Sequence, residues 1–510
     1  MTTERVVREA IRLVRAGQLA EAEALCGSIT PPQAAEAALS AVRAVNAAGH
    51  GNDASALQYV RQAVLDGDFV RTSLAGLCVQ VGNGLWRRGR EAALAAYFRA
   101  LALSPSIGNG LANAAVVLAN RGHAQDAIEL YERAVELDPG NARLRVVLAR
   151  NLANRQMTDR AIVHFEHAMK AGSAQADVIV DFGDLQMQAG RLDVARALVE
   201  RSIELDPAAW AGHFKLGVIA CREAGSKISA GSTANAFSCI ASDGVLSRDA
   251  AIQVHDIPVT LDAAVDMADV TFALPFRRDS DERVENLAVL LAYLSREFPA
   301  SQRFVYEEGE RKTVDLPTAT AHRLVESGDG FAHKTSLVNR MARDCSTGTF
   351  VSCDVDVIVP RRQMLSAIYL IQNGLCDLIY PFDGSCLDLD RDAVPHMVPL
   401  DEAAAQRFVT FRRPHNVGSC VVWSRQKFAE IGMENETFKI WGQHDGEILH
   451  RAIRLGLRVG RVLGNAYHLN HPRAYGLGIE TIRRRNFEEL DRVKRMSTAE
   501  MRAYVETMKR

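Results

Sequence analysis

Small and bulky apolar residues recur every 34 residues through the first half of the chain. Two recurring positions hold small residues, one holds a bulky apolar residue, and one holds proline or serine. The sets are Ala93, Ala127, Ala161, Ala195; Ala100, Ala134, Ala168, Ser202; Tyr97, Tyr131, Phe165, Val199; and Pro105, Pro139, Ser173, Pro207. Small residues let two helices cross closely, a ring fills the next gap, and proline follows the second helix. The pattern predicts an all-α solenoid over residues 1–225, with degenerate copies near its start.

The pattern changes in the second half of the chain. Small and polar residues at 229–235 indicate a loop, and we expect a linker over residues 226–266. Further on, β-rich runs at 270–276 and 303–306 alternate with helical patterns at 285–298 and 337–344. This alternation predicts an α/β domain over residues 267–510, whose ligands gather beyond the carboxyl ends of the strands.

Composition narrows the class of protein. The 510 residues include 60 basic and 62 acidic ones, so no overall field favours nucleic acid or an anionic membrane as a partner. The amino terminus lacks the apolar core of a signal peptide, and no run of about 18 apolar residues predicts an integral membrane segment. Nine widely spaced cysteines without a Cys-x-x-Cys pair argue against a disulfide framework or a zinc site. We expect a soluble, cytoplasmic protein.

Two carboxylates interrupt the apolar run at residues 349–359. Asp354 and Asp356 are one residue apart, so on a strand both side chains point the same way. A buried strand holds such a pair only with a counter-charge, and Mg²⁺ or Mn²⁺ suits carboxylate oxygens and bridges them to phosphates. The pattern predicts a metal-diphosphate site, with a simple turn cap at the sheet edge as the alternative.

A histidine pair lies further along the chain. His468 and His471 are three positions apart and can bind the same ion as Asp356, leaving positions open for phosphate oxygens. Such pairs are also common as plain surface histidines. The presence of the aspartate run favours the metal interpretation.

A third candidate is Asp445, which follows Trp441, Gly442 and His444. Apolar residues at helical spacing continue to Gly456, so Asp445 stands at a helix start. It can be a general base facing a sugar hydroxyl stacked on Trp441, or only a helix cap.

The fourth candidate is the end of the first β-rich run, at Pro275, Phe276 and Arg277. Arg277 and Arg278 stand at a strand end before a helix, where guanidinium groups can receive the uracil edge or the phosphates of a nucleotide. Exposed arginines near a helix start are also common without any ligand.

Two family resemblances follow from these segments. Residues 124–139 resemble the tetratricopeptide repeat. Residues 275–277, 350–360, 441–445, 448–451 and 468–471, in this order, look like the β-1,4-galactosyltransferase and chondroitin-synthase type of GT-A glycosyltransferase, whose domain is an α/β, Rossmann-like nucleotide-sugar transferase.

The second resemblance implies inverting transfer from a UDP-sugar with Mn²⁺ (or Mg²⁺). It implies Asp356, His468 and His471 as metal ligands and Asp445 as catalytic base. The nucleotide contacts it implies are Pro275, Phe276, Arg277 and Asp354, with Lys334 as a further positive charge for the diphosphate.

The chain departs from that family at several positions. His444 replaces a glutamate, Gly446 replaces an acidic residue, and His468 stands where methionine is frequent. Asn416 falls near the position where that family has a bulky tyrosine, which gates the 2-substituent of the sugar. A smaller residue at this position leaves room for an N-acetyl group. Trp441, Gly442, His444 and Asn416 are the expected sugar- or acceptor-binding residues.

The main hypothesis is a metal-dependent glycosyltransferase of polysaccharide biosynthesis. It moves a hexose or N-acetylhexosamine to a glycan or protein acceptor, while the concave face of the repeats recruits that acceptor or a protein partner. One alternative is a repeat scaffold with a catalytically inactive transferase-like domain, and another is a metal-dependent nucleotidyltransferase or hydrolase. The repeats can also be only a spacer or a dimer surface.

Overall fold

The computed structural model describes residues 3–50, 52, 55, 58–59, 62, 68–87, 93–120, 123–206, 210–225, 237–240, 251–255, 265–326, 332–440, 442–472 and 479–508. The chain forms two compact units. The first consists of Met1–Leu152 with Asp159–Ser173, and the second of Ala153–Thr158 with Ala174–Arg510.

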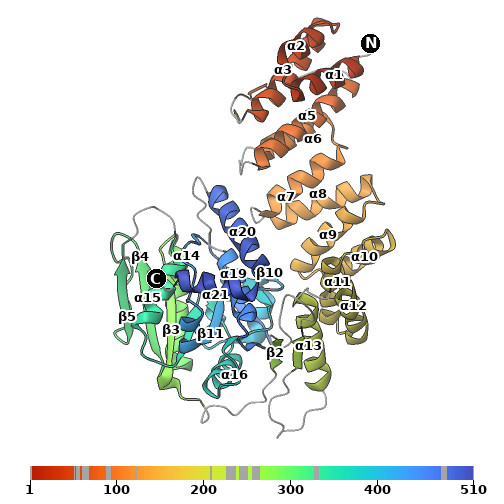
Figure 1. The fold of residues 1–510 in the computed structure, drawn as a ribbon. Helices are drawn as coiled ribbons and strands as arrows, with labels where there is room; N and C mark the ends of the chain where they lie inside the picture. The colour runs from red at the N-terminus through yellow and green to blue at the C-terminus, as the bar shows by residue number, and fades with distance from the viewer. Residues whose placement is uncertain are drawn as a thin grey trace. The chain divides into compact units, whose positions relative to one another are not determined.

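The first unit is a stack of helices, most of which pack on the next helix in the chain (Figure 1). They are α1 (Thr3–Arg15), α2 (Leu19–Gly27), α3 (Pro32–Gly49), α5 (Asp68–Arg87), α6 (Ala93–Leu103), α7 (Gly108–Asn120), α8 (Ala124–Leu137), α9 (Ala142–Asn154) and α10 (Thr158–Lys170). The recurring alanines are fully buried between these helices, and Tyr97, Tyr131 and Phe165 are buried beside them. The predicted helical solenoid is confirmed.

The last helices of the solenoid belong to the second unit. They are α11 (Ala176–Gln188), α12 (Leu192–Leu205) and α13 (Trp210–Gly225). Asp184 of α11 is buried between two cations, with Lys215 Nζ at 2.6 Å and Arg412 Nη1 at 2.8 Å. Apolar side chains of α11 to α13, such as Val180 and Val218, join the same core as the sheet described below.

A nine-stranded sheet forms the centre of the second unit, in the order β1-β2-β12-β8-β11-β6-β3-β4-β5. Its strands are β1 (Phe237–Ile240), β2 (Ala251–His255), β3 (Val270–Phe276), β4 (Gln302–Glu308), β5 (Thr320–Val325), β6 (Thr349–Cys353), β8 (Leu378–Tyr380), β11 (Cys420–Ser424) and β12 (Val459–Val462). Strands β3 to β6 run parallel, whereas β11 is antiparallel to β6 and β8. Strands β1 and β2 lie inside the stretch expected to be a linker.

Helices accompany this sheet as the predicted α/β alternation requires. They are α14 (Asp281–Glu297), α15 (Lys334–Asp344), α16 (Arg361–Gln372), α17 (Glu402–Ala405), α18 (Arg425–Glu430), α19 (Gln443–Arg454), α20 (Ile479–Arg495) and α21 (Thr498–Met508). The predicted fold class, a helical solenoid followed by an α/β domain of GT-A type, is confirmed.

A second, four-stranded sheet has the order β10 (Val409–Arg413), β9 (Cys386–Leu389), β13 (Ala466–Leu469) and β7 (Val357–Ile358). Strand β13 pairs antiparallel with β7, which places His468 opposite Val357. The amide of Leu469 also donates to the carbonyl of Asp356 at 2.8 Å. This pairing brings an aspartate and a histidine 112 positions apart in the sequence to one place.

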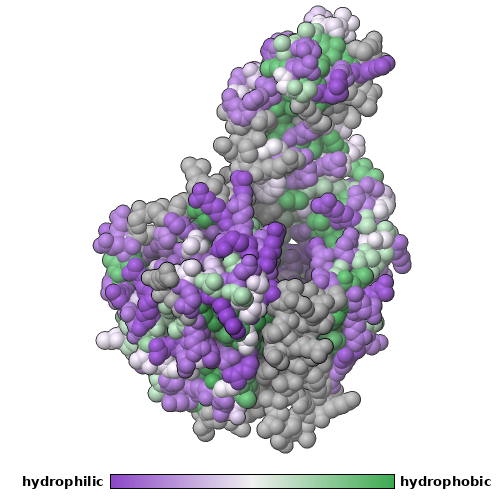
Figure 2. All heavy atoms as spheres, viewed as in Figure 1, coloured by the Kyte–Doolittle hydropathy of each residue, from purple (hydrophilic) through white to green (hydrophobic). Residues whose placement is uncertain are grey.

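Hydrophilic residues cover most of the described surface of the second unit in the view of Figure 2. No helix among the described residues is both long enough and apolar enough to span a membrane. The seven cysteines for which the structure gives a state are buried, free thiols.

Candidate active site

Three predicted metal ligands meet in the second unit. His471 Nε2 lies 3.1 Å from Asp356 Oδ2, and His468 Nε2 lies 3.7 Å from Asp356 Oδ1. One ligand atom from each side chain falls within 4.8 Å of the others. Burial opposes charge on Asp356, but His468, His471 and Arg283 outweigh it and lower the pKa of Asp356. The carboxylate is therefore anionic at neutral pH.

Neighbouring groups hold both imidazoles in place. His468 Nδ1 lies 3.1 Å from Asp388 Oδ1, and His471 Nδ1 lies 2.8 Å from the carbonyl of Pro472. His471 Nδ1 therefore donates to that carbonyl, and its Nε2 keeps a lone pair for a cation. At His468, Nδ1 also lies 3.4 Å from Arg413 Nη2, so its contact with Asp388 is an ion-pair contact that holds the ring in place. One carboxylate and two imidazoles are a suitable donor set for a first-row divalent ion.

Asp388 was not predicted, although it supports the site. It lies on β9, which pairs parallel with β13 and places Asp388 opposite His468. Arg413 Nη2 holds the Asp388 carboxylate at 2.8 Å. The only sequence signal is one acidic residue in the apolar strand Cys386–Leu389.

The carboxylate run differs from the prediction in one respect. Residues 349–359 do not form one strand, because β6 ends at Cys353 and a turn holds Asp354, where the amide of Val357 donates to the carbonyl of Asp354 at 3.2 Å. Strand alternation therefore does not orient the two aspartates. Asp354 Oδ1 instead lies 2.7 Å from Nζ of Lys334, which is the first residue of α15.

Asp445 lies in the first turn of α19 and is not its cap, since Gly442 occupies the N-cap position with φ of 121°. Its Oδ1 lies 3.2 Å from His444 Nε2. Burial raises the pKa of Asp445, but His444 and Lys334 outweigh this effect, and the pKa is lowered overall. Gly418 packs directly on the carboxylate, because a Cβ at that position would lie 2.4 Å from Asp445 Oδ2.

These groups surround a common cavity of about 250 Å³. The predicted residues that line it are Lys334, Asp354, Asp356, Asn416, Gly442, His444, Asp445, His468 and His471. Arg283, Arg413, Gly418, Ser419, Ile440 and Arg483 also line it and were not predicted. The candidate base and the candidate metal ligands therefore face one space, and the positively charged side chains of Lys334 and three arginines surround it.

The remaining predicted residues lie elsewhere. Pro275 and Phe276 are buried in β3, and Arg277 contacts Asp279 at 3.3 Å and Glu308 at 3.9 Å. These three residues do not line the cavity, and their nucleotide role stays a prediction. Trp441 lies outside the described residues.

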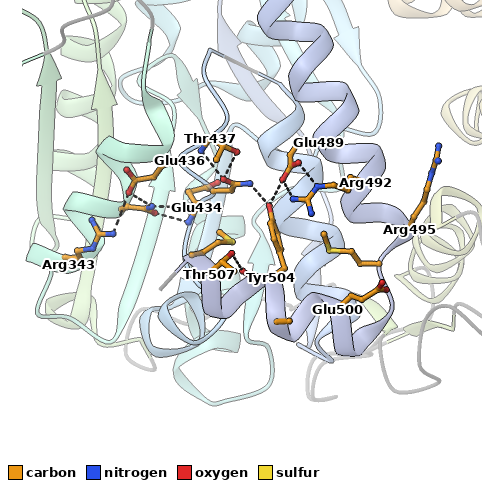
Figure 3. A pocket seen from close by; sticks show the side chains of 15 residues that line it. Arg343, Glu434, Glu436, Thr437, Glu489, Arg492, Arg495, Glu500, Tyr504 and Thr507 are labelled. Carbon is orange, nitrogen blue, oxygen red and sulfur yellow. Dashed lines mark hydrogen bonds and ion pairs between the residues drawn. The ribbon is translucent and has the colours of Figure 1, made fainter. Parts of the chain in front are cut away.

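A larger concavity of about 1060 Å³ lies beside α20 and α21 (Figure 3). Two ion pairs lie in it: Arg492 contacts Glu489 at 2.6 Å and Arg343 contacts Glu436 at 3.6 Å. None of the predicted metal ligands lines it, nor does Asp445. The smaller cavity is thus the candidate active site.

Comparison with known families agrees with the geometry. A tetratricopeptide-repeat model matches residues 118–162, and a model described as the N-terminal domain of galactosyltransferase matches residues 399–472. The second match contains Asp445, His468 and His471 and supports glycosyltransferase activity. The chain therefore joins segments similar to tetratricopeptide repeats and to a galactosyltransferase, and the predicted combination is confirmed.

The solved structures named here each match about a third of the chain or less. One is YrrB, described as a tetratricopeptide protein with an unusual peptide-binding site, at 22% identity and a TM-score of 0.29, covering 30% of this chain and 79% of that one. Another is a MamA segment from Desulfovibrio magneticus RS-1, at 21% identity and a TM-score of 0.28, covering 29% of this chain and 85% of that one. No curated protein matches the sequence significantly.

Proposed function

We propose that this protein is a metal-dependent, inverting glycosyltransferase that moves a hexose or N-acetylhexosamine from a UDP-sugar to a glycan or protein acceptor. The observation that carries the proposal is the shared cavity, in which Asp445 faces the same space as Asp356, His468 and His471. A transferase needs both functions together: a site for the diphosphate leaving group and a base for the incoming hydroxyl.

Asp445 is the proposed general base. Its lowered pKa keeps the carboxylate ionised at neutral pH, so that it can accept the proton of an acceptor hydroxyl. Such proton transfer contributes typically ~10²- to 10⁴-fold to the rate. Attack by that hydroxyl from the side opposite to the departing diphosphate inverts the anomeric carbon.

Asp356, His468 and His471 would hold Mn²⁺ or Mg²⁺, which when bound supplies charge neutralisation to the leaving diphosphate. Lys334 adds a fixed positive charge in the same cavity. Burial opposes that charge, but Asp354 and Asp445 outweigh it and raise the pKa of Lys334. Lys334 is therefore cationic at every working pH.

Asn416 is the proposed neighbour of the donor sugar. Its side chain is held in place, since Nδ2 donates to Ser419 Oγ at 3.0 Å and Oδ1 accepts from the amide of Gly418 at 2.8 Å. This small, fixed side chain supports an N-acetylhexosamine donor. The tetratricopeptide-type repeats are proposed to recruit the acceptor or a protein partner.

The test is an assay of the full-length protein with a panel of UDP-sugars and Mn²⁺, with and without glycan and protein acceptors. We expect acceptor-dependent release of UDP. Asp356→Ala should lose metal-dependent UDP binding, whereas Asp445→Asn should keep binding and lose transfer. UDP-sugar cleavage without any acceptor would instead indicate a hydrolase, and binding without turnover would indicate an inactive scaffold.

A further inference from the structure

The segment of residues 415–419 forms part of the candidate cavity and has an unusual main-chain conformation. Asn416, Gly418 and Ser419 are among the residues that line the cavity. His415 and Ser419 have φ angles of 61° and 67°, in the left-handed region that residues with a side chain rarely adopt. Such conformations persist only where the surrounding structure holds them in place. The segment therefore depends on contacts with other parts of the fold.

Two contacts hold the main chain of Asn416 from outside the segment. Its amide donates to the carbonyl of Gly384 at 2.9 Å, in the connection between β8 and β9. Its carbonyl accepts from Nη2 of Arg461 at 2.9 Å. Arg461 belongs to β12 and stands opposite Tyr380 of β8 in the central sheet. The sheet therefore supplies one of the two anchors directly, through a side chain.

The Arg461 side chain is part of the core. It is fully buried and does not line the cavity. Its guanidinium carbon lies 4.3 Å from the ring centroid of Tyr380 and 5.8 Å from that of Phe382, and aromatic faces attract such a cation. Burial lowers the pKa of Arg461 to about 10, although Tyr380 and Asp383 act to raise it, so the group is cationic at neutral pH. An apolar side chain would fill the same space without the desolvation cost of a charge, whereas the arginine also brings a donor to the Asn416 carbonyl.

The side chain of Asn416 has a fixed orientation. The amide of Gly418 can only donate, so the atom that it contacts at 2.8 Å is Oδ1, and Nδ2 therefore points to Ser419 Oγ at 3.0 Å. This contact uses one of the two hydrogens on Nδ2. The second hydrogen can donate to a ligand in the cavity, and the oxygens of a 2-acetamido sugar are suitable acceptors.

We propose that Arg461 is a positioning residue of the donor-sugar site: through the Asn416 carbonyl it holds residues 415–419 in the conformation that presents the Asn416 amide to the 2-substituent of the sugar. This inference rests on the proposed function for the identity of the ligand. Arg461 itself does not touch the sugar. A change at Arg461 therefore alters the discrimination between donor sugars, while Mn²⁺ and UDP keep their own ligands in the cavity.

The first test measures the segment without turnover. In the full-length protein, hydrogen exchange followed by mass spectrometry reports how readily the amides of residues 415–419 open. We expect exchange about 10-fold faster in Arg461→Gln than in the wild-type protein, because one main-chain anchor is lost. Arg458→Gln is the matched control, since Arg458 directly precedes β12 and pairs with Asp377 at 2.6 Å, and it should leave this exchange unchanged. Equal exchange in the wild-type protein and Arg461→Gln would overturn the proposal.

The second test measures donor selectivity, which a purely structural role would not change. A general loss of stability lowers transfer from every donor alike, whereas a displaced Asn416 changes the ratio of kcat/KM for a UDP-N-acetylhexosamine to that for the matching UDP-hexose. We expect this ratio to fall by about 10-fold in Arg461→Gln, with unchanged affinity for Mn²⁺ and UDP by calorimetry. Arg458→Gln should keep the wild-type ratio.

Arg461→Lys guards against a folding defect, because it keeps the buried charge but not the planar arrangement of donors. It should show both changes in the same direction. Where Arg461→Gln does not fold, unchanged exchange and an unchanged ratio in Arg461→Lys would overturn the proposal. A wild-type protein that turns over no UDP-sugar would contradict the proposed function, whatever the exchange result. An active Arg461→Gln enzyme with faster exchange and the wild-type ratio would overturn the positioning role alone.

Discussion

Gly418→Ala tests the assignment of Asp445 without changing any charged residue. The glycine lies in the loop before β11, and the Cβ that alanine adds would sit 2.4 Å from Asp445 Oδ2 and 2.5 Å from its Cγ. Heavy atoms in contact normally lie at roughly 3.5 Å. The carboxylate therefore has to move away by about 1 Å.

The expected cost follows from that displacement. A reacting group misplaced by about 1 Å can lose roughly 10²-fold in rate, which corresponds to about 2.7 kcal/mol in activation free energy. The three heavy atoms nearest to the added methyl group all belong to Asp445, so the base takes the closest clash. We therefore expect kcat to fall about 100-fold while Mn²⁺ and UDP bind with unchanged affinity.

The assay is steady-state transfer with the active UDP-sugar, combined with calorimetric titration of Mn²⁺ and UDP. Gly446→Ala is the matched control, because it adds the same methyl group one residue after Asp445 and meets only Leu490, at 3.6 Å. The control should transfer sugar at close to the wild-type rate. Wild-type kcat in Gly418→Ala, with a crystal structure showing a displaced carboxylate, would refute the role of Asp445 as base.

Three further predictions concern the support of the site. Asp388→Ala should weaken Mn²⁺ binding by about 10- to 100-fold, measured by calorimetry, and equal affinity would show that Asp388 does not support His468 as a metal ligand. Asp184→Ala leaves two buried cations without their counter-charge and should lower the free energy of unfolding by about 3–5 kcal/mol in denaturant titrations. A decrease in the free energy of unfolding of less than about 1 kcal/mol would contradict this prediction and show that water or local rearrangement stabilises the two cations. A fragment of residues 174–510 should keep Mn²⁺ affinity, whereas one of residues 226–510 should lose it, and equal affinity of the two fragments would argue against a structural role for the last helices.

Much of the helical half could be predicted from the sequence because each repeat buries the same positions against its neighbours. Ala127 and Tyr131 are buried for the same local reason as Ala161 and Phe165, and a 34-residue period records that reason directly. The period does not record what the last repeat packs against. Sequence periodicity therefore could not reveal that α11 to α13 share a core with the sheet.

The candidate site was only partly predictable. Asp356 and the histidine pair have recognisable local patterns, but their meeting depends on the pairing of β7 with β13. Asp388 is one of 62 acidic residues, and its role arises from the register that places it opposite His468. Gly418 lies in a loop whose course no local pattern specifies, so its close approach to the Asp445 carboxylate could not be predicted from the sequence.

Strand β10 connects the last helical repeat to the candidate metal ligands. Arg412 and Arg413 are neighbours on this strand and so point to opposite faces. Arg412 Nη1 reaches Asp184 of α11 at 2.8 Å, while Arg413 Nη2 reaches Asp388 Oδ1 at 2.8 Å, and the same oxygen lies 3.1 Å from Nδ1 of His468. Desolvation offsets much of the attraction within a buried ion pair, so such a pair is weak evidence for net stability, whereas removing one partner leaves an uncompensated charge. The last helical repeat therefore belongs to the framework that orients His468.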